Sequence, residues 1–340
     1  MRRIKLGRTG LIVNANGFGA LPIQRIALGD AVRLLQKAQE NGIDYFDTAR
    51  YYTDSEAKIG AALAPVRKDV VISTKTGAKT PEAFRADLET SLRMLRTDWI
   101  DIYQFHNPAY VPFPGDGTGM YEAMEEARRQ GKIRFIGITN HKLTLARKAV
   151  ASGMYATIQY PLSYLSTEQE LALSGACADA NVGLIAMKAL SGGLITDSAT
   201  AYAFLAQYGN IEPIWGVQRE NELDEFLSYN SVPPTMAPDM EVRIKSDREM
   251  LGGEFCRGCG YCMPCPAGIE ICNCARMSLL LRRAPLSVHL APEWQAKMEK
   301  VKSCLKCGKC KGKCPYGLDT PELLCRNYED YQTFLTKDRS

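Results

Sequence analysis

The sequence contains no hydrophobic run that approaches the 18 consecutive apolar residues of a membrane-spanning helix. Arg2 and Arg3 at its start are followed by no apolar core of signal-peptide length. These absences exclude the usual signals for membrane insertion and secretion. We therefore expect a cytoplasmic protein with no membrane partner.

Basic residues are only slightly in excess, which argues against binding to nucleic acid. The formal net charge is +4, and all of it lies in residues 231–340, which hold 17 Lys and Arg against 13 Asp and Glu. No nucleic-acid recognition motif accompanies this excess. We expect no nucleic-acid partner.

Cysteine is nearly absent from the first 255 residues, where Cys177 stands alone. Eleven more cysteines lie between residues 256 and 325. Without a secretory signal, this concentration favours metal or redox chemistry over a disulfide framework. The chain of 340 residues is long enough for one large domain and a smaller one.

Apolar, β-rich segments alternate with segments of helical period up to residue 230. After a hairpin formed by residues 2–7 and 11–15, the expected strands are 16–20, 43–48, 70–75, 100–106, 133–139, 156–160, 182–188 and 211–217. The expected helices include 30–41, 81–95, 119–130, 143–152, 167–180 and 198–208. Capping residues open three of them, at Asp30, Thr80 and Thr167. Eight strand–helix units predict a closed (β/α)8 barrel, an α/β fold. A doubly wound sheet is the alternative, but no G-x-G-x-x-G motif follows the first strand.

Polar residues stand at the carboxyl ends of the expected strands, where barrel enzymes carry their active sites. Three consecutive strands end in Asp47, Lys75 and His106. Later strand ends carry Asn140, Gln159 and Lys188. An aspartate, a lysine and a histidine on neighbouring strand ends predict an active site at this rim.

These strand-end residues resemble the motifs of the aldo/keto reductase superfamily, over residues 1 to about 230. The stretch FDTARYYTDSEAKIG is similar to the signature in which an aspartate precedes the catalytic tyrosine by five residues. That spacing selects Asp47 and Tyr52, and leaves Tyr51 as a packing or pocket-wall residue. STK and QFH then supply Lys75 and His106. The resemblance implies a catalytic tetrad of these four and an oxidoreductase that reduces a carbonyl compound, a small aldehyde or ketone.

The chemistry of carbonyl reduction explains these residue types. An oxygen that gains negative charge needs a proton, and Tyr52 is the expected donor, although an unperturbed tyrosine has a pKa of about 10. The cation of Lys75 is expected to lower that pKa, while Asp47 positions the lysine. His106 is expected to hydrogen-bond the carbonyl oxygen and orient it.

The same resemblance implies a nicotinamide cofactor. Arg219 would meet a 2′-phosphate, which favours NADPH, and Met187 stands where the family usually stacks an aromatic ring on the nicotinamide. The SGG turn at 191–193 lies where a loop covers the pyrophosphate. The expected cofactor contacts are Thr139, Asn140, Gln159, Met187, Lys188, Ser191, Gly192, Gly193, Gly216 and Arg219.

Residues 231–254, with three prolines and a charged second half, predict a linker. It separates a barrel domain of residues 1–230 from a cysteine-rich domain of residues 255–340. C-x2-C-x2-C runs begin at Cys256 and Cys304, and a Cys-Pro follows each. This matches the bacterial ferredoxin run, whose fourth cysteine ligates the other cluster, better than a zinc ribbon. Helical composition between the runs predicts a small, mainly α-helical iron–sulfur domain of the dicluster ferredoxin type.

Two 4Fe–4S clusters are expected from this pattern. The expected ligand sets are Cys256, Cys259, Cys262 with Cys314, and Cys304, Cys307, Cys310 with Cys265. The first run has two residues rather than three before its Cys-Pro, so Cys272 or Cys274 is an alternative to Cys265. Cys177 and Cys325 are expected to be buried apolar thiols.

The clusters leave three functions open. The first is NADPH-dependent reduction of a carbonyl compound, with the clusters as auxiliary electron carriers. The second is an electron-transfer enzyme whose clusters exchange electrons with a ferredoxin- or flavodoxin-like partner while the barrel serves a non-carbonyl redox substrate. The third is a regulatory, cofactor-sensing module, which the intact tetrad disfavours. A flavin would split the electron pair of a hydride into single electrons, but no flavin motif is present.

Overall fold

In the computed structural model, which describes residues 1–251, 255–283 and 286–338, the chain divides into two compact units. The first unit comprises Met1–Ala189 and Asp197–Ala237, and the second comprises Leu190–Thr196 and Pro238–Ser340. The predicted linker contains the helix α10 (Pro238–Leu251), which belongs to the second unit. Residues 252–254 of that linker lie outside the described residues.

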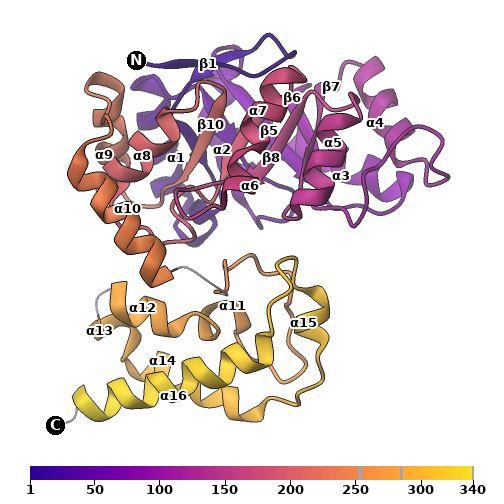
Figure 1. Cartoon of the computed structure of the whole chain (residues 1–340). Coiled ribbons are helices and arrows are strands. Elements are labelled where there is room, and N and C mark those ends of the chain that lie inside the picture. Colours follow the sequence, from indigo (N-terminus) through magenta and orange to yellow (C-terminus); the bar gives the residue numbers. More distant parts are fainter. Residues whose placement is uncertain (252–254, 284–285, 339–340) are drawn as a thin grey trace. The chain divides into compact units, whose positions relative to one another are not determined.

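The first unit is a closed barrel of parallel strands surrounded by helices (Figure 1), in the order β10-β3-β4-β5-β6-β7-β8-β9. The strands are β3 (Gly17–Gly19), β4 (Tyr45–Asp47), β5 (Val71–Thr76), β6 (Ile100–His106), β7 (Ile133–Thr139), β8 (Thr157–Pro161), β9 (Gly183–Met187) and β10 (Ile211–Gly216). Each lies within, or one residue beyond, a segment that the sequence predicts as a strand. The predicted (β/α)8 barrel is confirmed, and closure excludes the doubly wound alternative.

Helices follow the strands along the chain. They are α1 (Leu28–Glu40), α2 (Ser55–Leu63), α3 (Pro81–Leu95), α4 (Met120–Arg129), α5 (Leu143–Ala151), α6 (Glu168–Leu171), α7 (Leu173–Asp179), α8 (Ser198–Ala206) and α9 (Glu220–Ser231). Thr80 caps α3 by accepting a hydrogen bond from the Ala83 N–H, and Thr167 opens α6 with a capping box. The expectation that Asp30 caps the first helix is wrong, because α1 begins two residues earlier and Asp30 lies in its first turn.

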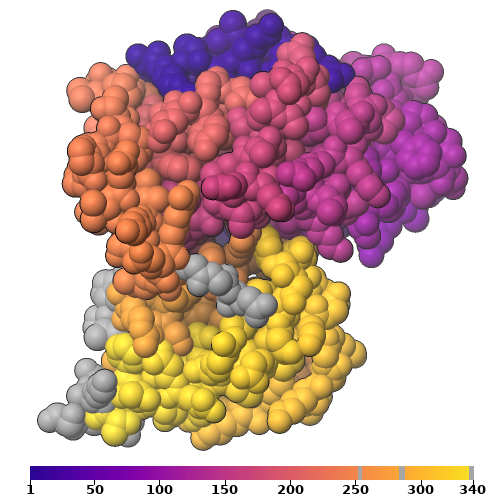
Figure 2. All heavy atoms as spheres, in the orientation of Figure 1, coloured from indigo at the N-terminus to yellow at the C-terminus, as the bar shows by residue number. Residues whose placement is uncertain are grey.

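An antiparallel hairpin of β1 (Arg3–Lys5) and β2 (Ile12–Asn14) lies at the amino-terminal ends of the barrel strands. Gly7 bridges to Val182, just before β9. The buried side chains of Leu6 and Val13 join the core cluster that contains Tyr45, near the start of its strand. The hairpin, indigo in Figure 2, forms one surface of the first unit. It closes this end of the barrel, so the opposite rim is the one available for chemistry.

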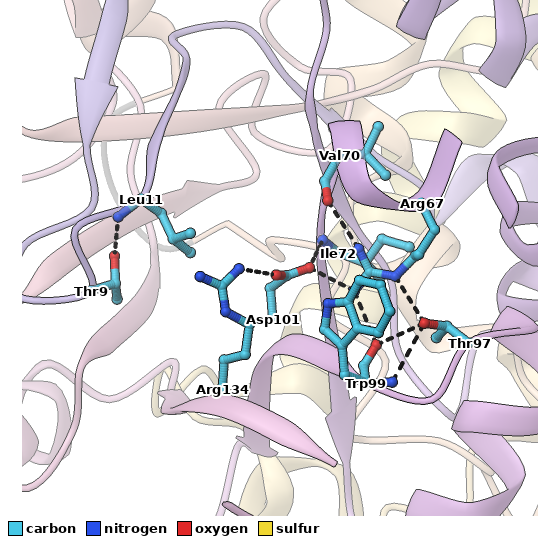
Figure 3. A network of polar contacts seen from close by, with 9 residues as sticks. All are labelled: Thr9, Leu11, Arg67, Val70, Ile72, Thr97, Trp99, Asp101 and Arg134. Carbon is cyan, nitrogen blue, oxygen red and sulfur yellow. Dashed lines mark hydrogen bonds and ion pairs between the residues drawn. The ribbon is translucent and has the colours of Figure 1, made fainter. Parts of the chain in front are cut away.

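A buried ion-pair network lies at the same amino-terminal end (Figure 3). Asp101, the second residue of β6, accepts hydrogen bonds from Arg67 (2.7 Å), Arg134 (2.7 Å) and the backbone N–H of Ile72 (3.0 Å). The Arg67 guanidinium also lies 4.6 Å from the centre of the Trp99 ring. Because a buried charge is costly unless it is paired, these contacts stabilise the barrel rather than serve catalysis.

The second unit is helical, as the sequence predicts. Besides α10 it contains α11 (Ile271–Cys274), α12 (Met277–Arg283), α13 (Leu286–His289), α14 (Pro292–Glu299), α15 (Lys309–Lys313) and α16 (Thr320–Asp338). The long helix α16 packs against α11, α12, α14 and α15 (Figure 1). No helix in the described part of the chain is long and apolar enough to span a bilayer.

Candidate active site and cluster cavities

Lys75 and Asp47 form a buried ion pair at the carboxyl-terminal rim of the barrel. Asp47 ends β4 and Lys75 lies near the end of the neighbouring strand β5. The Lys75 Nζ lies 2.6 Å from Asp47 Oδ2 and 2.6 Å from the carbonyl oxygen of Thr48. Burial lowers the pKa of Lys75 and raises the pKa of Asp47, and the ion pair opposes both shifts. Asp47 therefore keeps Lys75 positively charged at a buried position where desolvation alone would favour the neutral lysine.

Tyr52 and His106 complete a cluster around this pair. The Lys75 Nζ lies 5.5 Å from the centre of the half-buried Tyr52 ring. His106, at the end of β6, meets Tyr52 edge-on with ring centres 6.0 Å apart. Tyr51 stacks on the same imidazole at 6.3 Å, but 61% of its surface is exposed. The structure thus brings the four predicted tetrad residues together, with Tyr51 as an outer wall.

The His106 imidazole is neutral at physiological pH. Burial, reinforced by the positive charge of Lys75, lowers its pKa to about 3. Its Nδ1 is buried and has no hydrogen-bond partner among the described residues. An unpartnered buried N–H costs more than an unpartnered lone pair, which favours the tautomer with the proton on Nε2.

Two of the predicted cofactor residues, Thr139 and Gln159, lie beside this cluster. Strand register aligns His106 with Thr139 and Thr139 with Gln159 in one row across β6, β7 and β8. Gln159 donates to Asp47 Oδ2 (3.3 Å) and accepts from Gln104 Nε2 (2.7 Å). The Thr139 hydroxyl lies 3.9 Å from the sulfur of Met187. Sequence reasoning missed Gln104, although it precedes His106 by two residues and so lies on the same face of β6.

Asn140, another predicted cofactor contact, makes two hydrogen bonds with neighbouring loops. Its side-chain amide donates to the carbonyl oxygen of Pro108 (2.9 Å), and its side-chain oxygen accepts from the Lys142 N–H (2.8 Å). The side chain therefore holds the loop after β6 against the loop after β7.

The predicted pyrophosphate turn belongs to the second unit. Lys188 and Ser191 have positive φ values of 58° and 49°, followed by Gly192 and Gly193 at 69° and 91°. Segment Leu190–Thr196, which contains this turn, packs with the second unit, where Arg276 donates to the Gly192 carbonyl oxygen at 2.9 Å. No sequence motif marks Arg276.

Gly216 and Arg219 lie at and just after the end of β10. Gly216 is the last residue of the strand, and Arg219 is the N-cap of α9. The Arg219 side chain is exposed, and its guanidinium lies 3.8 Å from a carboxylate oxygen of Glu222. An exposed guanidinium at a helix amino terminus is well placed to bind an anion.

Two cavities in the second unit are lined by the predicted cluster cysteines. The first is lined by Cys256, Cys259, Cys262 and Cys314, and also by Cys272. The second is lined by Cys265, Cys304, Cys307 and Cys310, and also by Cys262. Each cavity therefore combines cysteines from both runs, as the crossed ligand pattern requires.

The donor chemistry of both cavities fits iron–sulfur clusters. Each cavity is lined by cysteines from both runs, and the thiolate is the ligand that such clusters take.

The remaining cysteines have separate places. Cys272 lines the first cavity and not the second, and the Cys274 thiol contacts the carbonyl oxygen of Lys297 at 3.7 Å, so the structure favours Cys265 as the crossing ligand. Cys177 is buried, as expected, whereas Cys325 is only half-buried.

A closed parallel barrel with an Asp–Lys pair, a tyrosine and a histidine at its carboxyl-terminal rim defines an oxidoreductase of the barrel type. The chain belongs to the aldo/keto reductase family, whose model matches residues 15–201, and carries a 4Fe-4S dicluster domain, matched over residues 255–319.

Relatives support the same assignment. The chain is 31% identical over 211 residues to the L-galactose dehydrogenase of Arabidopsis thaliana, a match that covers 56% of this chain and 66% of that protein. It is 28% identical over 253 residues to the NADH-specific methylglyoxal reductase of Escherichia coli (strain K12), covering 66% of this chain and 77% of that one. The protein is therefore an oxidoreductase.

Solved structures share the fold. An aldo-keto reductase from Bacillus halodurans in its holo form superimposes with a TM-score of 0.63 at 20% identity, covering 73% of this chain and 96% of that one. An aldo-keto reductase from Klebsiella pneumoniae in complex with NADPH gives a TM-score of 0.62 at 21% identity, covering 72% and 94%.

The crossed cavities predict which substitutions affect the same cluster. Anaerobically isolated protein should hold about eight irons per chain, the content of two four-iron clusters. Cys265→Ala and Cys307→Ala should each leave about four irons, and the double variant should also leave about four, because both remove the second cluster. Iron analysis of the purified variants measures this.

A second pair tests the crossing itself. Cys265→Ala combined with Cys259→Ala should lose nearly all iron, although these two cysteines are neighbours in sequence, while Cys177→Ala should keep about eight. Retention of four irons in the Cys259–Cys265 double variant would contradict the crossed assignment.

Proposed function

We propose that the protein reduces the carbonyl group of a small molecule with NADPH, and that two 4Fe–4S clusters serve it as auxiliary electron carriers. The observation that carries this proposal is the meeting of Tyr52, Lys75, Asp47 and His106 at the carboxyl-terminal rim of the barrel.

Proton transfer is the part of the reaction that this cluster performs. The oxygen of a carbonyl under reduction gains negative charge, and Tyr52 delivers the proton to it. The Lys75 cation stabilises the charge that remains on the tyrosine oxygen, because a nearby positive charge favours the ionised form. Asp47, hydrogen-bonded to Lys75 at 2.6 Å, keeps that cation in place.

His106 orients the substrate. As a neutral imidazole with its proton on Nε2, it donates one hydrogen bond to the carbonyl oxygen and carries no charge that would compete with Lys75. The loop that follows β6 supplies a wall for the substrate, since Tyr110 and Phe113 are exposed there.

The residues at the rim fit a nicotinamide nucleotide, which supplies the hydride when bound. Thr139 and Gln159 present polar groups beside Asp47, and the exposed guanidinium of Arg219 suits a 2′-phosphate. One relative is named as specific for NADH, so Arg219 is the feature that favours NADPH in this chain.

The names of the relatives indicate the substrate class. L-galactose dehydrogenase and methylglyoxal reductase both act, by their names, on small oxygenated molecules. We infer a small aldehyde or ketone as the substrate, and methylglyoxal is the probe for the tests below.

The clusters would supply one-electron chemistry. Segment Leu190–Thr196, which carries the predicted pyrophosphate turn, belongs to the cluster-bearing unit. There Arg276 donates to the Gly192 carbonyl oxygen, and its guanidinium would lie 2.9 Å from a Cβ on Gly258, which stands between the expected ligands Cys256 and Cys259. These contacts support a link between the predicted turn and the first cluster.

Tyr52→Phe should lower the kcat for methylglyoxal reduction by about 10²–10⁴-fold, because it removes the proton donor. NADPH binding, measured by fluorescence titration, should be unchanged. The matched control is Tyr51→Phe, which should keep near-normal kcat because the outer ring only lines the site. A near-normal kcat in Tyr52→Phe would refute the tetrad assignment.

Arg219→Ala should weaken NADPH binding by about tenfold or more, since a charge-assisted pair with a phosphate contributes about 1.5–3 kcal/mol. NADH, which lacks the 2′-phosphate, should bind with equal affinity to both proteins. Fluorescence titration of the two nucleotides measures this. Equal affinities of the unaltered protein for NADPH and NADH would contradict the assignment.

The electron-carrier role predicts that reduced clusters can pass electrons to the substrate. Dithionite, a one-electron reductant, should bleach the clusters of the anaerobic protein, and two reduced clusters with two protons hold what one carbonyl needs to become an alcohol. Methylglyoxal added without NADPH should then restore the visible absorption of the clusters, recorded by stopped flow, and Cys259→Ala, which lacks one cluster, should show a smaller change. Clusters that stay reduced after methylglyoxal is added would show that they are only structural.

A further inference from the structure

The first cluster cavity contains one thiol more than a four-iron cluster takes. Cys256, Cys259, Cys262 and Cys314 supply the four thiolates, and Cys272 lines the same cavity as a fifth cysteine. The second cavity shows a different pattern, because its extra cysteine is Cys262, already counted as a ligand of the first.

The backbone holds Cys272 against the ligand-bearing loop. It lies in the short helix α11, which packs on the long helix α16. Its sulfur is 3.9 Å from the sulfur of Cys262, and its carbonyl oxygen is 3.8 Å from the sulfur of Cys256. Two separate atoms of Cys272 therefore contact two different ligand cysteines.

Ligation of iron by Cys262 decides which of the two sulfurs donates the hydrogen bond. Either sulfur is able to donate when both are thiols. A cysteine that ligates iron is a thiolate and has no proton to give. Once Cys262 holds the cluster, only the S–H of Cys272 is left as the donor.

We propose that Cys272 is a positioning residue for the first cluster. Its S–H donates a hydrogen bond to the ligand sulfur of Cys262, and this bond raises the reduction potential of the cluster. The proposal rests on the assignment of a cluster to this cavity in the proposed function. Reduction adds one electron, and part of the added negative charge falls on the ligand sulfurs. A donor at a ligand sulfur stabilises the reduced state more than the oxidised state. The donor therefore shifts the potential of the first cluster relative to that of the second.

The test is an EPR-monitored redox titration of the anaerobic, full-length protein. Cys272→Ala should keep about eight irons and shift the midpoint potential of one cluster to a more negative value, with the other unchanged. Cys272→Ser retains a donor, the hydroxyl, and should shift that potential less than alanine does. The matched control is Cys274→Ala, two residues along the same helix, which removes a thiol that contacts Lys297 and should leave both potentials unchanged.

Three results would overturn the proposal. Unchanged potentials in Cys272→Ala would show that the contact does not tune the cluster. Loss of about four irons in both Cys272→Ala and Cys272→Ser would make Cys272 a ligand instead. Equal shifts of both clusters, or an equal shift in Cys274→Ala, would indicate a general structural effect. Failure of the proposed function is distinguishable, because the unaltered protein would then lack the iron and the signals of two clusters.

Discussion

Closure of the parallel barrel is the constraint on which the site depends. Because all eight strands run in one direction, their carboxyl ends meet at a single rim, and register sets which side chains become neighbours. Asp47 and Lys75 are 28 residues apart in sequence and are brought to 2.6 Å by the pairing of β4 with β5. Burial of either charge alone would cost several kcal/mol. Each group therefore keeps the other ionised despite burial, and closure of the barrel places the Lys75 Nζ 5.5 Å from the centre of the Tyr52 ring.

The second unit depends on a different constraint. Each of its cavities takes cysteines from two runs that lie some 40 to 50 residues apart, and α16 is the element against which the intervening helices pack. Metal binding by such a set couples to folding, because the ligands converge only in the folded state. In the proposed function, the folding of the helical unit is therefore coupled to the clusters that its cysteines bind.

Features that have a local pattern or a fixed spacing were predictable from the sequence. The eight strands, the tetrad and the two cysteine runs each occupy short segments with a recognisable period or spacing. The sequence did not predict α10, because the prolines of residues 231–254 indicate a linker, yet Pro238 opens the helix at a position where proline is favourable. The contact of Arg276 with Gly192 was also missed, because it joins segments 84 residues apart and has no local signal. Cys272 was predicted only as an alternative ligand, because spacing alone does not show which cavity it lines.

Segment Leu190–Thr196 follows the barrel strand β9 (Gly183–Met187) closely in sequence, but it packs with the second unit. The Arg276 guanidinium lies close to Gly192 and Gly258, whose φ values of 69° and 62° favour glycine at both positions. Gly258 stands between Cys256 and Cys259, and ligation of these cysteines fixes its loop. In the proposed function, loading of the first cluster therefore orders the loop at Gly258 and, through Arg276, the turn at Gly192.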